Sequence, residues 1–326
     1  MQYTFLGRTG VSVSRVCLGC MSFGAKSWRP WVLEEEDSKP YFRQAVESGI
    51  NFFDTADVYS LGESERITGK WLKEFARLEE CVVATKAFFE MGPGPNMKGL
   101  SRKHIQQACE ASLKRLGLET IDIYQLHRFD KHTPMEETLA ALDLLVRQGK
   151  VRYIGCSSTW AWRFAQALSQ SERNGWARFV TMQNHYNLLY REEEREMLPL
   201  CEAEGVASIP WSPLARGILA RARTTFDEAD SQSRQATDDF ARKLYDHPSD
   251  IHVVEALKEV AGRRGDTPAQ IALAWLLSKP VVAAPIIGVT RLDHLTDAVK
   301  AVDLELSEQE IAALETPYQP HGVRGL

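Results

Sequence analysis

Eight short apolar segments, each associated with a segment of helical periodicity, constrain the fold of this 326-residue chain more than any other feature. They are mostly apolar on both faces, which is typical of parallel strands covered by helices. Strands are predicted at residues 16–19, 51–54, 81–86, 121–127, 151–156, 179–183, 206–211 and 284–288. Helices are predicted at residues 34–48, 64–75, 102–116, 135–148, 160–174, 192–204, 251–262 and 292–302. This alternation indicates an α/β protein.

The number of strand–helix units favours a closed (β/α)8 TIM barrel, with residues 1–326 forming a single domain. A doubly wound sheet of the Rossmann type is the alternative, but no Gly-x-Gly-x-x-Gly follows the first predicted strand. Residues 1–15 are expected to form an N-terminal hairpin that plugs the bottom of the barrel. Residues 87–100 and 212–250 are expected to be loops, the second of them long and placed after strand seven. Extra helices, one of them at residues 267–277, are expected near the C-terminus.

The charge balance limits the partners that this chain can bind. With 39 basic and 44 acidic residues, the net charge is −5, which argues against a general nucleic-acid or anionic-membrane surface. No apolar run approaches the roughly 20 residues that span a membrane, and the N-terminus lacks the apolar core of a signal peptide. We therefore expect a cytoplasmic protein whose partners are small molecules. The sequence indicates no oligomeric state.

The cysteines and histidines do not suggest a metal site. Six cysteines are spread along the chain, mostly in apolar surroundings, and are expected to be free buried thiols. Cys17 and Cys20 have C-x-x-C spacing, but no second pair of ligands lies nearby. The eight histidines show no H-x-H or H-x-x-x-H pairing, and no G-x-S-x-G elbow is present. We therefore expect neither a bound metal nor a serine nucleophile of that type.

Four polar residues follow successive predicted strands. Asp54 ends the second strand and Tyr59 comes shortly after it, while Lys86 and His127 end the third and fourth strands. The C-terminal ends of parallel strands meet at one edge of the sheet, where α/β proteins place their chemistry. Taken singly, each residue has a structural interpretation, such as a turn cap, a packed ring or a solvated strand end. Taken together, they predict a catalytic site.

The chemistry of this set points to a proton donor. A tyrosine is a weak acid at neutral pH, because its reference pKa is about 10. A neighbouring ammonium favours the phenolate, and a neutral imidazole can share a hydrogen bond with the phenol and a substrate oxygen. We therefore predict that Tyr59 donates the proton, with Lys86 tuning it, Asp54 holding Lys86, and His127 orienting a carbonyl. A Schiff base on Lys86, in an isomerase or lyase, is the alternative.

These four residues resemble the catalytic tetrad of the aldo-keto reductase superfamily. Residues 49–56 are close to the signature of that family, Ser64 and Glu65 continue it, and residues 126–128 match its histidine strand. The resemblance covers essentially the whole chain and looks nearest to bacterial members and to the group that includes potassium-channel β subunits. It implies a barrel that binds NADPH without a Rossmann motif and that reduces aldehydes or ketones reversibly. The alternative that it leaves open is a regulatory NADPH-binding subunit with little or no turnover.

The resemblance also implies cofactor-binding positions. They are Gly19, Cys20, Met21, Asp54, Ser157, Ser158, Gln183, Trp211, Ser212, Pro213, Leu214, Arg216, Gly217, Gly288, Thr290, Arg291, His294 and Asp297. Trp211 stands where many members have a tyrosine that stacks on the nicotinamide. Arg291 begins a predicted helix and suits a ribose 2′-phosphate, so NADPH is expected to be preferred over NADH. Ser158, His294 and Ala298 depart from the residues usual in the family.

Aromatic residues in the predicted loops suggest the substrate pocket. The expected contributors are Trp28, Phe88, Phe89 and Phe129, together with the loop at residues 212–250. They favour an apolar or aromatic carbonyl compound, although the same residues are also typical of ordinary loop packing. The long loop is expected to become ordered when the cofactor binds.

Overall fold

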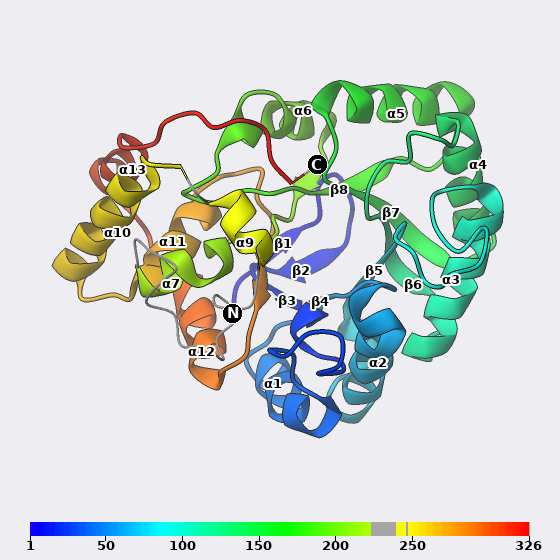
Figure 1. Ribbon diagram of the computed structural model, residues 1–326, viewed down its shortest axis with the longest axis horizontal. Helices are drawn as coiled ribbons and strands as arrows, with labels where there is room; N and C mark the ends of the chain where they lie inside the picture. Colours follow the sequence, from blue (N-terminus) through cyan, green and yellow to red (C-terminus); the bar gives the residue numbers. More distant parts are fainter. Residues whose placement is uncertain (223–238, 246, 326) are drawn as a thin grey trace.

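The computed structural model describes residues 1–222, 239–245 and 247–325. Residues 223–238 and 246 of the loop predicted at 212–250 lie outside the described residues. The expected ordering of this loop when the cofactor binds therefore lies outside them as well. The chain forms a parallel barrel surrounded by helices (Figure 1). Its strands are β3 (Cys17–Gly19), β4 (Phe52–Asp54), β5 (Val82–Ala87), β6 (Ile121–Leu126), β7 (Val151–Ser157), β8 (Phe179–Gln183), β9 (Ala207–Ser208) and β10 (Ile286–Gly288).

Helices alternate with these strands, as the sequence predicts. Those that cover the barrel are α1 (Glu35–Glu47), α2 (Glu63–Phe75), α3 (Arg102–Leu116), α4 (Met135–Arg147), α5 (Ala161–Asn174), α6 (Met197–Glu204) and α12 (Leu292–Ala301). Further helices are α7 (Ile218–Arg221), α9 (Asp239–Leu244), α10 (Asp250–Arg264), α11 (Pro268–Leu277) and α13 (Glu308–Glu315). The expected helix at 192–204 is interrupted, because a short 3-10 turn, η4 (Glu192–Glu194), precedes α6.

The strand order around the sheet is β10-β3-β4-β5-β6-β7-β8-β9, and every neighbouring pair is parallel. The circle closes through backbone hydrogen bonds of 2.9 Å from Ala283 to Ser208 and from Ile286 to Pro210. The seventh barrel strand, β9, is shorter than the predicted 206–211, and Pro210 lies just beyond it and lacks the N–H that a central strand needs. The structure thus confirms the (β/α)8 barrel.

The N-terminal hairpin occupies the bottom of the barrel. Strands β1 (Tyr3–Phe5) and β2 (Ser12–Ser14) pair in antiparallel fashion. Leu6 and Val13 are fully buried in one apolar cluster with barrel residues such as Phe52 and Ile123. The backbone N–H of Arg8 also donates to the carbonyl of Gly205, at 2.9 Å. Apolar burial therefore closes this end, and the polar residues collect at the other.

A separate helical layer covers one side of the barrel, where α7, α10, α11 and α13 gather (Figure 1). Its core includes the fully buried Trp275 together with Leu257 and Leu314. After α13 the chain runs back toward the barrel, as the red segment of Figure 1 shows. This return brings the last described residue, Gly325, to the catalytic end, where it lines the cavity described below.

Candidate active site

Strand geometry brings the four predicted polar residues together. Asp54 is the last residue of β4, Lys86 lies near the end of β5, and His127 directly follows β6. Asp54 is level with Ala84 of β5, so its side chain and that of Lys86 come from adjacent strand ends. Tyr59 begins a short 3-10 turn, η2 (Tyr59–Gly62), in the loop after β4. Three strand ends and one loop thus form the site.

Lys86 is the centre of this group and is fully buried. Its ammonium donates to Asp54 Oδ2 at 2.5 Å and to the carbonyl oxygen of Thr55 at 2.8 Å. It also lies 3.4 Å from the hydroxyl oxygen of Tyr59. Burial alone would lower the pKa of Lys86, but the carboxylate of Asp54 and the phenol oxygen of Tyr59 outweigh burial and raise that pKa. The lysine therefore remains an ammonium, which is the wrong form for attack on a carbonyl as a Schiff-base nucleophile.

Two glutamines hold the other oxygen of Asp54. Gln125 Nε2 and Gln183 Nε2 each donate to Asp54 Oδ1 at 2.9 Å. Both glutamines are buried, on β6 and β8. The carboxylate is therefore fixed by three donors, and it in turn fixes the position of the Lys86 ammonium. Gln183 was predicted to bind cofactor, whereas Gln125 was missed, although an amide within an apolar strand is itself a signal of a buried polar contact.

His127 faces Tyr59 edge-on. The two ring centroids lie 5.7 Å apart with planes at 83°, and Phe89 packs on the imidazole in the same T-shaped way, at 4.8 Å. Burial, together with the charges of Lys86 and Arg128, holds the pKa of His127 well below its ordinary value. The imidazole is therefore neutral near pH 7 and can share a hydrogen bond with a substrate oxygen.

This neutral state has a measurable consequence for stability. In the unfolded chain His127 binds a proton below about pH 6.5, whereas in the folded protein it stays neutral. The contribution of His127 to the free energy of unfolding is therefore complete above that pH and is lost on acidification. We expect the free energy of unfolding of the wild type, relative to that of His127→Gln, to fall by about 1 kcal/mol between pH 7.5 and 5.5. Urea denaturation of both proteins at the two pH values measures it. A wild-type-minus-variant difference that stays constant would contradict the neutral assignment.

A cavity of about 890 Å³ opens beside the tetrad. The predicted catalytic residues Tyr59, His127 and Asp54 line it, while Lys86 lies beneath its surface. The other predicted residues that line it are Gly19, Met21, Trp28, Ser157, Gln183, Trp211, Ser212, Pro213, Leu214, Arg216, Gly217, Gly288, Thr290, Arg291, His294 and Asp297. Segments far apart in the sequence therefore converge on one space, as the resemblance implies.

Four predicted residues do not line this cavity. Cys20 is fully buried in the core, with its thiol directed toward the carbonyl of Leu18. Ser158 lies behind Trp211 and accepts a hydrogen bond from the indole Nε1 at 3.0 Å. Phe88 and Phe129 pack against the hydrophobic core, whereas Phe89 lines the cavity beside His127. Of the two adjacent phenylalanines, the local backbone turns only the second toward the site.

Trp211 has a rigid support that the sequence did not reveal. The imidazole of His185 stacks on the indole with centroids 4.2 Å apart and planes at 10°. His185 is itself stacked on Tyr190 at 4.3 Å. Burial, followed by the positive charges of nearby arginines and His321, holds the pKa of His185 well below its ordinary value. The indole is thus backed by a neutral aromatic layer, which suits a flat wall for an aromatic ligand.

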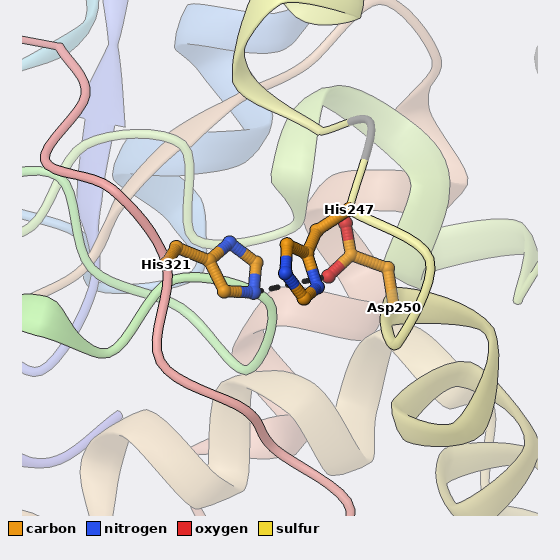
Figure 2. A group of neighbouring side chains, drawn as sticks. All are labelled: His247, Asp250 and His321. Carbon is orange, nitrogen blue, oxygen red and sulfur yellow. Dashed lines mark ion pairs between the residues drawn. The ribbon is translucent and has the colours of Figure 1, made fainter.

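A second group of ionisable side chains lies outside the cavity lining and anchors the C-terminal segment (Figure 2). His321 Nε2 lies 3.4 Å from Asp250 Oδ1, and the ring of His247 stacks on that of His321 at 4.4 Å. We interpret these contacts as a clamp that holds the C-terminal segment beside the start of α10.

Comparison with known proteins shows the family of the chain. The Aldo/keto reductase family model matches residues 15–318. The chain is 42% identical over 344 residues to the versiconal hemiacetal acetate reductase of Aspergillus parasiticus, covering 99% of this chain and 98% of that protein. It is 41% identical over 350 residues to an aldo-keto reductase of Fusarium vanettenii, covering 100% of this chain and 93% of that protein. An aldo-keto reductase of Alternaria alternata is 40% identical over 347 residues, covering 99% of this chain and 93% of that protein.

The chain therefore belongs to the aldo/keto reductase family and is an oxidoreductase of the kind that reduces carbonyl groups. Members of this family generally use nicotinamide cofactors. These relatives are fungal, so the expected closeness to bacterial members and to channel β subunits stays a prediction. In the described part of the chain, no helix is both long and apolar enough to cross a membrane.

Proposed function

We propose that the protein uses NADPH to reduce an aldehyde or ketone to the alcohol, with Tyr59 as the proton donor. One observation carries the proposal: the hydroxyl of Tyr59, 3.4 Å from a buried ammonium, lines the same cavity as the neutral His127. A cavity of about 890 Å³ is within the range that binds cofactors and substrates. The reaction runs in both directions, so the same residues oxidise an alcohol when NADP⁺ is bound.

The lining of the cavity fits a phosphorylated dinucleotide. Arg216 and Arg221 are cations from the segment after β9, and Arg291 is the N-cap residue of α12. A helix N-terminus with an arginine attracts phosphate. At another part of the lining, the supported indole of Trp211 offers a flat face for the nicotinamide. NADPH, when bound, supplies a hydride to the carbonyl carbon.

The residues of the chain manage the charge and the proton. His127 donates a hydrogen bond to the carbonyl oxygen and holds it beside the hydroxyl of Tyr59. As negative charge develops on that oxygen, Tyr59 transfers its proton to it. The ammonium of Lys86 stabilises the phenolate that remains, and Asp54 keeps the ammonium in place. The aromatic walls restrict water around the reacting carbonyl.

The test is the loss of nicotinamide absorbance when the purified protein meets NADPH and a panel of carbonyl compounds, with NADH in parallel. The panel includes a hemiacetal, because one relative is named as a hemiacetal acetate reductase. Carbonyl-dependent consumption of NADPH, faster than that of NADH, is the expected result. Tight binding of NADPH without turnover on any compound would favour the regulatory-subunit alternative. Failure to bind either nucleotide would refute the cofactor assignment.

Arg291 provides a specific test of the preference for NADPH. In the structure its guanidinium forms a two-point ion pair with Asp293, at 2.7 and 3.0 Å, and both side chains are largely exposed. A ribose 2′-phosphate would take over this cation as a bidentate acceptor. We expect Arg291→Ala to weaken NADPH binding by roughly 10- to 100-fold while leaving NADH binding nearly unchanged. Fluorescence titration with both nucleotides measures the change.

The matched control is Arg77→Ala, which removes an exposed arginine that is paired with Glu79 and lies outside the cavity lining. It should bind both nucleotides as the wild type does. Equal weakening of NADPH and NADH binding in Arg291→Ala would contradict the assignment of Arg291 to the 2′-phosphate.

A further inference from the structure

Two arginines in the cavity lining are not explained by the tetrad or by the proposed phosphate sites. Arg128 directly follows His127, and Arg29 lies in the loop between η1 (Cys20–Ser22) and α1. Both line the cavity on the side of the catalytic pair. Neither of them was predicted from the sequence to be a substrate residue.

Arg128 lies beside the reacting group. Its Nη1 donates to the backbone carbonyl of His127 at 2.6 Å, and its guanidinium carbon lies 5.7 Å from the ring centroid of Phe89. Phe89 in turn packs on the imidazole of His127. Arg128 is half-buried, and this burial lowers the pKa of its guanidinium. Only one of its five N–H groups is used in this contact.

Arg29 lies near Tyr59 through the ring of Trp28. Its guanidinium carbon lies 4.8 Å from the ring centroid of Trp28, and the Trp28 ring lies 6.3 Å from that of Tyr59. The Nε of Arg29 is buried and makes no hydrogen bond. Arg29 therefore contacts Trp28, which neighbours Tyr59, and Arg128 contacts Phe89, which packs on His127.

Neither arginine has a counter-ion among the residues that the structure describes. By contrast, Lys86 is paired with Asp54, and Arg291 is paired with Asp293. A guanidinium that is partly removed from water and not neutralised is costly, and a bound anion reduces that cost. The planar fork of N–H donors on arginine matches a carboxylate in particular.

We propose that Arg29 and Arg128 form a carboxylate-binding subsite, so that the substrate is an aromatic or otherwise apolar aldehyde or ketone that carries a carboxylate. This inference rests on the proposed reductase function and names the substrate class for the same site. The arginines bind the carboxylate, while Trp28 and Phe89 contact the apolar body of the substrate. The carbonyl is thereby held next to Tyr59 and His127.

The test compares 4-formylbenzoate with its methyl ester, which has the same aldehyde but no charge. We expect the wild-type kcat/KM for the carboxylate to exceed that for the ester by at least about 10-fold, the effect of one charge-assisted pair. Arg128→Met and Arg29→Met should each bring this ratio close to one. Arg128→Lys, which keeps the positive charge, should restore part of it.

A matched control removes a cation from the same loop. Lys26 is about half exposed and is paired with Glu34 and Asp37, and it does not line the cavity. Lys26→Met should therefore keep the wild-type ratio. A wild type that prefers the ester, or arginine variants that keep the wild-type ratio, would overturn the subsite. So would an Arg128→Met protein whose main defect is weakened NADPH binding, because Arg128 would then serve the cofactor.

Binding without turnover separates this inference from the proposed reaction. Titration of the NADP⁺-loaded protein with benzoate and with benzamide, followed by tryptophan fluorescence, needs no catalysis. Tighter binding of benzoate that is lost in Arg29→Met and Arg128→Met supports the subsite even if no aldehyde is reduced. Equal binding of benzoate and benzamide overturns the subsite even if carbonyl reduction is fast.

Discussion

Tyr59→Phe should lower kcat for carbonyl reduction by about 10²- to 10⁴-fold, the usual size of a general-acid contribution. Its hydroxyl oxygen lies 3.4 Å from the ammonium of Lys86, and its ring meets that of His127 edge-on within the cavity lining. Phenylalanine keeps the ring and its packing but has no proton to donate. NADPH binding should therefore be nearly unchanged. Steady-state kinetics and a fluorescence titration with NADPH measure the two properties.

The matched control is Tyr3→Phe, which removes an exposed hydroxyl that donates to the carbonyl of Gly49 at the bottom of the barrel. It should retain wild-type turnover. If Tyr59→Phe also retained it, the proton-donor assignment would be wrong. If Tyr59→Phe lost NADPH binding as well as turnover, the residue would be holding the cofactor rather than serving the chemistry.

Asp54→Leu should destabilise the protein by about 3–5 kcal/mol, because it leaves the ammonium of Lys86 buried without its counter-ion. It also removes the acceptor of the amides of Gln125 and Gln183. The double variant Asp54→Leu/Lys86→Met has no buried charge at this position and should recover much of the lost stability. Turnover should stay low in both proteins. In Asp54→Leu the ammonium beside Tyr59 has lost the carboxylate that holds it, and in the double variant the ammonium itself is absent.

Urea denaturation of the wild type, Lys86→Met, Asp54→Leu and the double variant completes a thermodynamic cycle for the pair. The proposed pairing requires the double variant to be more stable than Asp54→Leu. If the loss of stability in the double variant equalled the sum of the two single losses, the two side chains would contribute independently. Recovery of turnover in the double variant would remove Lys86 from the proposed chemistry.

Parallel strands made the convergence of the four polar residues predictable from the sequence. Asp54, Lys86 and His127 end consecutive strands, and neighbouring parallel strands carry their C-terminal residues to the same edge. Tyr59 follows by only five residues, so the chain has little freedom to place it elsewhere. The barrel itself was predictable for the same reason, since each apolar strand alternates with an amphipathic helix.

Contacts between distant segments were not predictable in this way. The amides of Gln125 and Gln183 reach Asp54 across 71 and 129 residues of sequence, and those contacts depend on strand register and barrel closure. Local backbone direction decides that Phe89 rather than Phe88 lines the cavity. The C-terminal segment runs back to the cavity at Gly325, and no periodic pattern in its sequence predicts this path.

One of the expected extra C-terminal helices was not given a position, although the sequence carries its signal. Helix α13 (Glu308–Glu315) begins with a capping box, in which Ser307 accepts from the N–H of Glu310 and the carboxylate of Glu310 accepts from that of Ser307. A serine followed three residues later by a glutamate is a recognised helix start. The same arrangement of Thr267 and Gln270 begins α11, which was predicted.

The most direct test of the central claim follows the hydride. The protein is incubated with NADPH in which both hydrogens at C4 of the nicotinamide are replaced by deuterium and with an aldehyde that it reduces, and the alcohol is analysed by mass spectrometry and NMR. We predict one deuterium on the former carbonyl carbon of the alcohol and a solvent-derived proton on its oxygen. An alcohol without deuterium at that carbon would contradict hydride transfer from NADPH and, with it, the function proposed for this site.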